Sequence, residues 1–485
     1  MGILYRPDDG VAADFIPFYW RGNYHLFYLK DYRDPDGHGE GTPWFHLVTR
    51  DFVHFRDWGE ALPRGKPNAQ DLWVFTGSVI HHEDLFHIYY TGHNSHFREA
   101  NKPVQAVMHA TSPDLRTWAK DDAFDFFAPT DLGYEPNDWR DPHVFWNDEA
   151  GEYQMLLAAR KTHGPDRHRG CIALAGSPDL AAWSVRDPFW APDLYYTHEC
   201  PDVFRIGRWW YLVYSTFSER CVTHYRMART LQGPWLAPAN DTFDGRAYYA
   251  AKTAGTPGHW YSFGWLPTRV GEKDDGDWQW GGNLVVHEIA QRPDGTLVVH
   301  APDTVLEAFG QRVELCPKVE LGSWQATTHG WRSDAQSRFS ALTLGALPEE
   351  CLCKTAISYA EGTASFGLLL RAQEKLEAYY QVRLEPAAQR IVVDRWPRPG
   401  DQPFMLERPL TMLPDRPITL RLIIDGTCLV VYADDEVALS CRIYAHRRGA
   451  LGLFVSEGAA CFKVRNIHEA QGTLEMSLHR DDHTC

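Results

Sequence analysis

Tyr24-His-Leu-Phe-Tyr-Leu29 decides the fold, because similar phrases recur four more times along the first part of the chain. Each phrase is an aromatic and aliphatic run of strand length with turn-forming residues before it, which predicts the second strand of a β-hairpin. The later copies are Phe86-His-Ile-Tyr-Tyr-Thr91, Tyr153-Gln-Met-Leu-Leu-Ala158, Tyr211-Leu-Val-Tyr-Ser-Thr216 and Tyr261-Ser-Phe-Gly-Trp-Leu266.

A second phrase follows the first in the early repeats. Its clearest copy is Ala110-Thr-Ser-Pro-Asp-Leu-Arg-Thr-Trp118, with counterparts at residues 48–55 and 175–183 and a degenerate one at 228–235. A strand, a turn with Asp or Pro, and then an aromatic residue that closes the unit is typical of a propeller blade. We therefore expect five four-stranded blades over residues 1–303; an unrelated set of hairpins in a sandwich is the alternative.

The pattern changes after the last blade. Long alternating segments such as 365–371, 378–384, 418–424, 429–432, 449–455 and 461–465 replace the repeated phrases. Alternation bounded by turns predicts an antiparallel β-sandwich over residues 322–485. Residues 304–321 are expected as a linker, with a short helical bridge at 304–309. The predicted fold class is all-β.

Composition narrows the class of ligand. The 485 residues carry a formal charge of −16 and contain no Lys/Arg run, which argues against nucleic acid and anionic membranes and favours a neutral small molecule or oligosaccharide. Aromatic residues make up 13% of the chain, which suits both sugar stacking and core packing. No stretch approaches the ~18 apolar residues of a membrane span, and the start lacks a signal-peptide pattern, so we expect a cytoplasmic protein.

The cysteines give little evidence of a metal site. Ten are scattered along the chain, and only Cys351 and Cys353 lie close together, without a second pair or neighbouring His residues. A tetrahedral metal site needs more ligands than this, so ordinary thiols are expected.

Three carboxylates share a position in their repeats. Asp14 lies ten residues before Tyr24, Asp141 twelve before Tyr153, and Glu199 twelve before Tyr211. The first strand of each propeller blade is the innermost, so residues at the start of these strands meet in a funnel on the axis. Singly, each acid is typical of a turn; their common phase favours a shared site.

Such a cluster could hydrolyse a glycosidic bond. That reaction needs an acid that protonates the leaving oxygen and a carboxylate that attacks the anomeric carbon or activates water. Clustered acids should raise at least one pKa, while a neighbouring cation keeps another acid ionised. Arg140, adjacent to Asp141, is the candidate cation and a candidate hydrogen-bond donor to the sugar.

Two motifs carry a family resemblance. Trp139-Arg-Asp-Pro142 and Glu199-Cys-Pro-Asp202 resemble the Arg-Asp-Pro and Glu-Cys-Pro motifs of glycoside hydrolase family 32, the invertases, inulinases and levanases. Weaker signatures agree in order at residues 44–55, 75–78, 90–92, 243–251, 280–283, 420–425 and 430–433. The resemblance covers nearly the whole chain and implies a β-propeller with a trailing β-sandwich.

The resemblance also implies roles. Asp14 would be the nucleophile, Glu199 the acid/base and Asp141 the transition-state stabiliser in a retaining cleavage of a β-fructofuranoside. The nucleophile and the acid/base would then lie about 5 to 5.5 Å apart. The family uses no metal and no organic cofactor.

Blade one departs from the family. Family members carry Trp-Met-Asn-Asp-Pro-Asn-Gly at the nucleophile, whereas this chain reads Val11-Ala-Ala-Asp-Phe-Ile-Pro17. The asparagine before the nucleophile is Ala13, and the glutamine that ends the first aromatic phrase is Leu29. Both are family contacts to the sugar, so two partners of the first subsite are missing and another substrate than sucrose is expected.

Other residues could supply contacts to the sugar. Candidates for replacing the lost partners are Asp9, Asp31, Trp73, His93 and Asn94, of which His93 and Asn94 follow Tyr90-Thr-Gly92 at the expected mouth of the funnel. The full set of expected substrate-binding residues is Arg140, Trp73, Phe75, Ser78, His93 and Asn94.

Several functions remain open at this point. A fructotransferase or difructose-anhydride-type enzyme would let a sugar hydroxyl replace water, and the altered first subsite also permits another furanoside such as an arabinofuranoside. A non-catalytic sugar-binding propeller is the third class. The sandwich is expected to buttress the propeller or to mediate dimer contacts, with sugar binding as the alternative.

Overall fold

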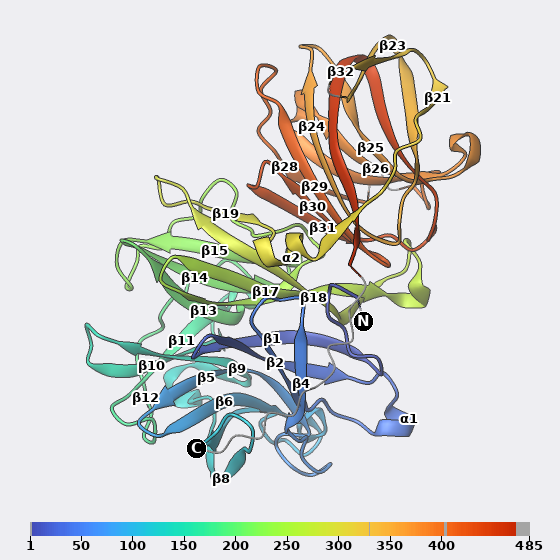
Figure 1. Ribbon diagram of the computed structural model, residues 1–485. Helices are drawn as coiled ribbons and strands as arrows, with labels where there is room; N and C mark the ends of the chain where they lie inside the picture. The colour runs from blue at the N-terminus through green and yellow to red at the C-terminus, as the bar shows by residue number, and fades with distance from the viewer. Residues whose placement is uncertain (1, 329, 402–404, 472–485) are drawn as a thin grey trace.

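The protein consists of a five-bladed β-propeller and a β-sandwich (Figure 1). The computed structural model describes residues 2–328, 330–401 and 405–471. Its helices are short: α1 (Pro35–His38) and α2 (Asp303–Glu307), and the 3₁₀ turns η1 (Ser95–Arg98), η2 (Thr130–Leu132), η3 (Asp166–His168), η4 (Val270–Glu272), η5 (Glu374–Leu376) and η6 (Pro386–Ala388).

The first part of the chain forms the blades in sequence order. Their strands are β1 (Val11–Trp20), β2 (Asn23–Asp31), β3 (Trp44–Thr49) and β4 (Phe55–Leu62) in blade one; β5 (Trp73–His82), β6 (Leu85–His93), β7 (Gln105–Ser112) and β8 (Ala119–Phe126) in blade two; β9 (Tyr134–Asn147), β10 (Glu152–Lys161), β11 (Gly170–Ser177) and β12 (Ser184–Val185) in blade three; β13 (Glu199–Ile206), β14 (Trp209–Thr216) and β15 (Val222–Ala228) in blade four; β16 (Tyr249–Thr256), β17 (His259–Arg269), β18 (Trp278–Gln291) and β19 (Leu297–His300) in blade five.

The repeated aromatic phrases form the second strands of their hairpins, as the sequence predicts. Each aromatic phrase lies in the second strand of its blade, namely β2, β6, β10, β14 and β17. The prediction of four strands per blade is wrong for blade four, where β15 is followed only by the isolated bridges Met227↔Leu236 and His224↔Thr242. Pro234 and Pro238 stand in this segment and lack the backbone N–H that a strand ladder requires.

Each innermost strand contains an irregularity at the same place. The regular ladder with the second strand ends at Ala13, Phe75, Arg140, Glu199 and Tyr249 in blades one to five. The next residue is Asp14, Thr76, Asp141, Cys200 or Ala250, and four of these have a left-handed backbone, with φ of 42° at Asp14, 58° at Asp141, 50° at Cys200 and 50° at Ala250. Such bulges re-aim side chains, often beside active sites.

The ring of blades closes between its first and last members. Strand β1 pairs with β18 through Ala12↔Gly282, so blades one and five share a continuous sheet. The segment before β1 adds to this closure, because the carbonyls of Leu4 and Tyr5 accept hydrogen bonds from the Asn283 side chain and the Leu284 backbone N–H.

The second domain is a sandwich whose layers share one long strand. β32 (Ala450–Ala470) pairs with β25 through its first part and with β24 through its second, and β23 runs beside both parts. The other strands are β20 (Phe309–Arg312), β21 (Lys318–Leu321), β22 (Trp324–Thr327), β23 (Gly330–Ala346), β24 (Glu350–Tyr359), β25 (Ser365–Ala372), β26 (Tyr379–Glu385), β27 (Arg390–Trp396), β28 (Leu406–Pro409), β29 (Ile418–Asp425), β30 (Cys428–Ala433) and β31 (Val437–Arg442).

Two details of this domain differ from the sequence prediction. The segments expected as separate strands at 449–455 and 461–465 form the single strand β32, because Glu457 and Gly458 have positive φ within a bulge and make no chain reversal. The expected linker 304–321 begins with α2 but also contains β20 and β21, which pair with β32 and β23.

The sandwich lies against blade five (Figure 1), and buried polar contacts join the two. The Arg442 guanidinium of β31 donates to the carbonyls of Leu266 and Pro267 in β17, both at 2.9 Å. Asp244 accepts a 2.8 Å hydrogen bond from the Ser440 backbone N–H and pairs with His287 of β18 at 3.0 Å. The sandwich therefore supports β17 and β18, two of the three blade-five strands that line the funnel.

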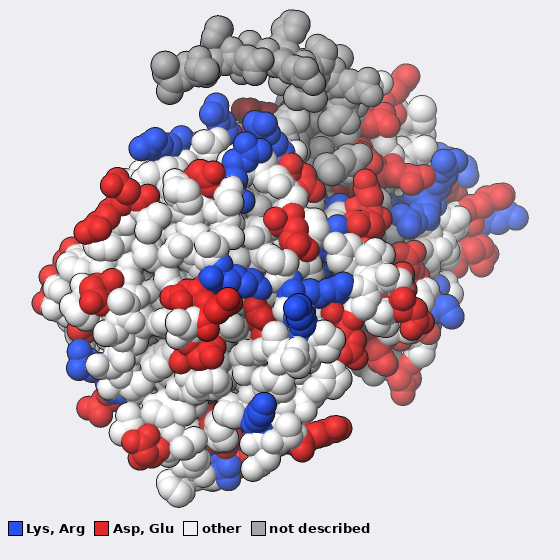
Figure 2. Space-filling view, turned by 90° about the horizontal axis from the view of Figure 1, so that it is seen from below, with Lys and Arg blue, Asp and Glu red and all other residues white. Residues whose placement is uncertain are grey.

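The surface charge is mixed, and the cysteines of the described residues form no disulfide. On the described part of the face in Figure 2, Lys and Arg side chains are scattered among Asp and Glu. None of the helices in the described residues is long and apolar enough to cross a membrane. The nine cysteines in the described part of the chain are free thiols.

Candidate active site

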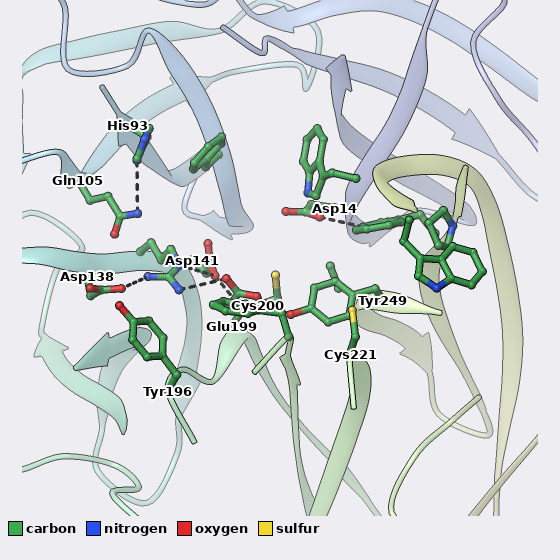
Figure 3. A pocket seen from close by; sticks show the side chains of 18 of the residues that line it. Asp14, His93, Gln105, Asp138, Asp141, Tyr196, Glu199, Cys200, Cys221 and Tyr249 are labelled. Carbon is green, nitrogen blue, oxygen red and sulfur yellow. Dashed lines mark hydrogen bonds and ion pairs between the residues drawn. The ribbon is translucent and has the colours of Figure 1, made fainter. Parts of the chain in front are cut away.

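The three predicted carboxylates meet in one cavity of about 550 Å³ at the centre of the propeller (Figure 3). Asp14 comes from β1, Asp141 from β9 and Glu199 from β13. Figure 3 shows Asp14 across the cavity from Asp141 and Glu199, which lie side by side. The irregular inner strands thus bring together acids that are far apart in the sequence.

Asp14 is held by two donors from neighbouring blades. The Thr76 hydroxyl donates to Asp14 Oδ2 at 2.7 Å, and the Trp265 indole N–H donates to Oδ1 at 2.9 Å. Withdrawal of the carboxyl from water raises the pKa of Asp14 to about 7, and the negative charges of Asp141 and Glu199 act in the same direction, against the two hydrogen bonds. Both oxygens are fixed in position.

Asp141 is ordered by backbone groups. Its Oδ2 accepts a 2.9 Å hydrogen bond from the Cys200 N–H, and its own N–H donates to the Thr91 hydroxyl at 2.7 Å. Burial raises the pKa of Asp141 to about 6, although the positive charge of Arg140 opposes this shift. The predicted rise of an acid pKa is confirmed, but burial contributes more to it than repulsion between the acids.

Glu199 lies between a cation and a phenol. Arg140 Nη2 donates to Glu199 Oε1 at 3.1 Å, and the Tyr249 hydroxyl donates to Oε2 at 2.5 Å. Arg140 also pairs with Asp138 at 2.8 Å, and its Nε lies 3.8 Å from Asp141. Burial alone would lower the pKa of Arg140, but the surrounding carboxylates raise it above its ordinary value, so the guanidinium stays charged.

The predicted substrate-binding residues separate into two groups. Arg140, Phe75 and His93 line the cavity, with the His93 and Phe75 rings stacked at 4.7 Å. Burial lowers the pKa of His93 to about 4, and the charges of Arg140 and Arg98 add to the effect, so the imidazole is neutral near pH 7. Trp73 lines an adjoining hollow that shares Phe75 with the cavity.

Ser78 and Asn94 do not line the cavity. The Ser78 hydroxyl accepts from the Val144 N–H at 2.9 Å and so joins blades two and three. The fully buried Asn94 side chain donates to the carbonyls of Pro67 and Ala69 and caps η1 by accepting from the His96 N–H. Their hydrogen bonds lie within the protein framework and do not point toward a ligand.

Three further side chains touch the carboxylates, and a signal for two of them was present in the sequence. Thr76 lies ten residues before Phe86, the phase of Asp14, and Tyr249 lies twelve before Tyr261, the phase of Glu199. The same positions in the repeats hold hydroxyl-bearing residues as well as acids, and these hydroxyls donate hydrogen bonds to the acids. The Trp265 contact with Asp14 joins residues of blades five and one, so it needs the closed ring.

This arrangement can perform acid and nucleophile chemistry on a sugar. Asp14 accepts hydrogen bonds from neutral donors, whereas Asp141 and Glu199 share the Arg140 cation. Aromatic side chains also line the cavity, namely Trp278, Trp280, Tyr196 and Phe217. Within the described residues, no group of three or more His, Cys, Asp or Glu side chains is arranged to hold a metal ion.

Relatives with solved structures share this fold. A sucrose-6-phosphate hydrolase from Lactobacillus gasseri superposes with a TM-score of 0.73 at 18% identity, covering 98% of this chain and 93% of that one. The exo-inulinase from Aspergillus awamori superposes with a TM-score of 0.72 at 18% identity, covering 97% and 98%. At this identity the likeness shows the propeller and sandwich architecture.

Sequence relatives match more locally. A levanbiose-producing levanase of Bacillus subtilis (strain 168) is 28% identical over 207 residues, which are 41% of this chain and 36% of the relative. The match to the levanbiose-producing levanase of Geobacillus stearothermophilus covers 44% of that protein. The chain therefore matches less than half of the length of either levanase. A β-fructofuranosidase, insoluble isoenzyme 1, of Daucus carota is 24% identical, covering 88% of this chain and 81% of the relative.

Family models cover both domains. The glycosyl hydrolases family 32 N-terminal domain matches residues 10–298, and the family 32 C-terminal domain matches residues 323–469. These ranges contain all three carboxylates, the five blades except the end of β19, and most of the described sandwich. The chain belongs to glycosyl hydrolase family 32.

Proposed function

We propose that the protein hydrolyses β-fructofuranosides with retention of configuration, using Asp14 as nucleophile and Glu199 as general acid and base. The observation that carries the proposal is the placement of Asp14 on blade one across the cavity from Glu199 on blade four, with each acid held by its own donors. The names of the relatives, levanase and β-fructofuranosidase, support a fructoside as the substrate.

The reaction has two steps. An Asp14 oxygen forms a bond to the anomeric carbon while the bond to the leaving oxygen breaks, and Glu199 gives its proton to that oxygen. Water then attacks the anomeric carbon, Glu199 takes the proton of the water, and the bond to Asp14 breaks. Arg140 and Tyr249 hold Glu199 in line for both proton transfers, and Asp141 accepts hydrogen bonds from sugar hydroxyls.

Two isosteric variants test these roles. Asp14→Asn should lower kcat by roughly 10⁴-fold or more with the fold intact, because no covalent intermediate can form. Glu199→Gln should lose far less activity on an aryl fructofuranoside than on an oligofructan, since a good leaving group needs little protonation. Asp131→Asn, an exposed acid outside the cavity, serves as the matched control.

The substrate screen decides between related activities. Levan, inulin, sucrose, difructose anhydrides and aryl arabinofuranosides would be offered to the wild type at low and high concentration. Release of reducing sugar with no larger products is expected from the fructosides. Cleavage of the arabinofuranosides alone would contradict the fructoside assignment, and accumulation of larger saccharides would replace hydrolysis by transfer.

A further inference from the structure

A second hollow of about 430 Å³ adjoins the catalytic cavity. It shares Phe75 and Trp280 with the cavity and is otherwise lined by Trp73 and by the β2–β3 loop from Asp31 to Thr42. The two shared aromatic residues are therefore the boundary between the spaces. We call this second space the blade-one groove.

The groove and the acid/base belong to different blades. The lining of the groove comes from blade one, the start of blade two and the rim of blade five, with no contribution from blades three or four among the described residues. Glu199 is on blade four, together with Phe217 and Cys221 at the adjacent wall of the cavity. A leaving group must reach Glu199 for its proton, so the groove faces the sugar that stays bound to Asp14.

The boundary between the catalytic cavity and the groove is aromatic, and the two family sugar contacts of blade one are replaced by apolar residues. Ala13 and Leu29 are paired across β1 and β2 and fully buried, so neither offers a polar atom to a sugar. Phe75 and Trp280 at the boundary present rings. A bound furanose thus gains no hydrogen bond from Ala13, Leu29 or Phe75, and only the Trp280 indole N–H can donate to it at this boundary. A substituent on the furanose could pass between the two rings.

Hydrogen bonds and an ion pair hold the loop that lines the groove. Arg33 fastens its loop to the blade-five rim by donating to the Thr268 hydroxyl and the Trp280 carbonyl, both at 2.6 Å. On the other side, Glu40 pairs with His96 of the blade-two rim at 2.7 Å. The loop is also braced by Arg64, which donates to the carbonyls of His38, Gly39 and Gly41.

The lining suits a neutral polyhydroxyl ring. Three carboxylates, Asp31, Asp34 and Glu40, line the groove, and the one guanidinium among its lining residues, that of Arg33, is already engaged with the blade-five rim, so an anionic group would be repelled. Carboxylates accept hydrogen bonds from hydroxyls, and the rings of the half-buried Trp73 and the exposed Trp280 can stack on a sugar ring. These are the recognition elements of a carbohydrate subsite.

We propose that the blade-one groove binds a second sugar residue, attached to the furanose that Asp14 attacks, so that the enzyme releases a two-sugar unit. This inference rests on the proposed fructoside hydrolysis and names its substrate class: oligofructans with at least two sugar residues on the non-leaving side. The residues that determine this specificity are Trp73 and the Asp31 to Thr42 loop.

The test compares short and long glycones. Methyl β-fructofuranoside fills only the first subsite, whereas tetrasaccharides of the levan type and of the inulin type can fill both. We expect disaccharide as the first product from at least one tetrasaccharide, with kcat/KM at least about ten-fold above that for the methyl glycoside. Comparing the two tetrasaccharides shows which linkage reaches the groove.

Variants locate the effect. Trp73→Ala should reduce the ratio of kcat/KM for the preferred tetrasaccharide to that for the methyl glycoside by about ten-fold. Trp146→Ala removes an exposed tryptophan of β9 that lies outside both spaces and should leave the ratio unchanged. Free fructose as the sole first product, or equal loss in both variants, would overturn the proposal while fructoside hydrolysis stands. No cleavage of any fructoside would instead refute the proposed function.

Discussion

The irregularity in each inner strand determines which side chains face the central cavity. In a regular strand only every second residue faces the axis, but the left-handed φ of Asp14, Asp141 and Cys200 turns consecutive residues toward the same space. A non-glycine residue in this region costs about 1–3 kcal/mol, so the surrounding blades must impose it. The cavity can therefore hold both Arg140 and Asp141, and both Glu199 and Cys200.

The Thr76 hydroxyl offers a test of how Asp14 is tuned. It stabilises the ionised carboxylate, so Thr76→Val should raise the pKa of Asp14 above its value of about 7. In the proposed mechanism Asp14 attacks only when ionised, so kcat/KM should fall as the pH drops through this pKa. We expect the acidic limb of the kcat/KM profile near pH 7 in the wild type and about one pH unit higher in the variant.

The pH profile distinguishes a change in the pKa of Asp14 from a general loss of activity. Thr111→Val makes the same isosteric change at a half-buried position of β7, outside the cavity, and should leave the limb in place. A Thr76→Val profile that is uniformly lower, with an unmoved acidic limb, would show that the hydroxyl does not set the ionisation of the nucleophile.

The three acids are predictable from the sequence to a greater extent than the side chains around them. Asp141 and Glu199 stand in recognisable motifs, and the repeat phase brings Asp14 to the same cavity. Asn94 was expected at the mouth because its loop is there, but a loop position does not fix side-chain direction, and this side chain caps η1. The blade-one groove depends on loops from three blades meeting, which no local pattern encodes.

At the scale of the element, the second repeated phrase forms a self-contained turn. In blade one, Asp51 Oδ1 accepts hydrogen bonds from the backbone N–H groups of Val53 and His54 at 3.0 and 2.8 Å. Asp114 and Asp179 make the corresponding bonds in blades two and three. Blade four lacks this acid and also lacks a full fourth strand, which indicates that the turn helps to position the strand that follows it.

Asp51→Ala tests the contribution of this turn. The variant loses the acceptor for two N–H groups, and we expect the free energy of unfolding to fall by about 1–2 kcal/mol at pH 7. Asp51→Asn keeps a side-chain acceptor and should lose less. Urea unfolding measures both, with Asp84→Ala, an exposed turn residue between β5 and β6, as the control.

The same turn should respond to pH in a defined direction. Burial alone would raise the pKa of Asp51, but hydrogen bonds from His54 and Val53 lower it below its ordinary value. The stability from this carboxylate is therefore present above the unfolded pKa of about 3.9 and lost as the pH falls through the folded value. A deficit of the alanine variant that grows on acidification would contradict this account.

At the scale of the whole molecule, the sandwich acts on the site through β17 and β18. Trp265, which donates to Asp14, is followed directly by Leu266, whose carbonyl accepts from Arg442 of the sandwich. Asn283 of β18 links the same guanidinium at 2.7 Å to the Leu4 carbonyl at 2.8 Å. The chain start, blade five and the sandwich thus converge on one buried cation, which binds the residue next to Trp265, the donor to Asp14.

Arg442→Met tests whether this junction holds the two domains together. Methionine keeps much of the apolar stem but leaves the Leu266 and Pro267 carbonyls without their buried donor, so the free energy of unfolding should fall by about 3 kcal/mol. Because β17 also carries Trp265, kcat/KM well below the unfolding midpoint should fall as well. Arg447→Met, on an exposed arginine of the same domain, should change neither quantity. If Arg442→Met kept the urea midpoint and activity of that control, the junction would be dispensable, and blade five would hold its strands without the sandwich.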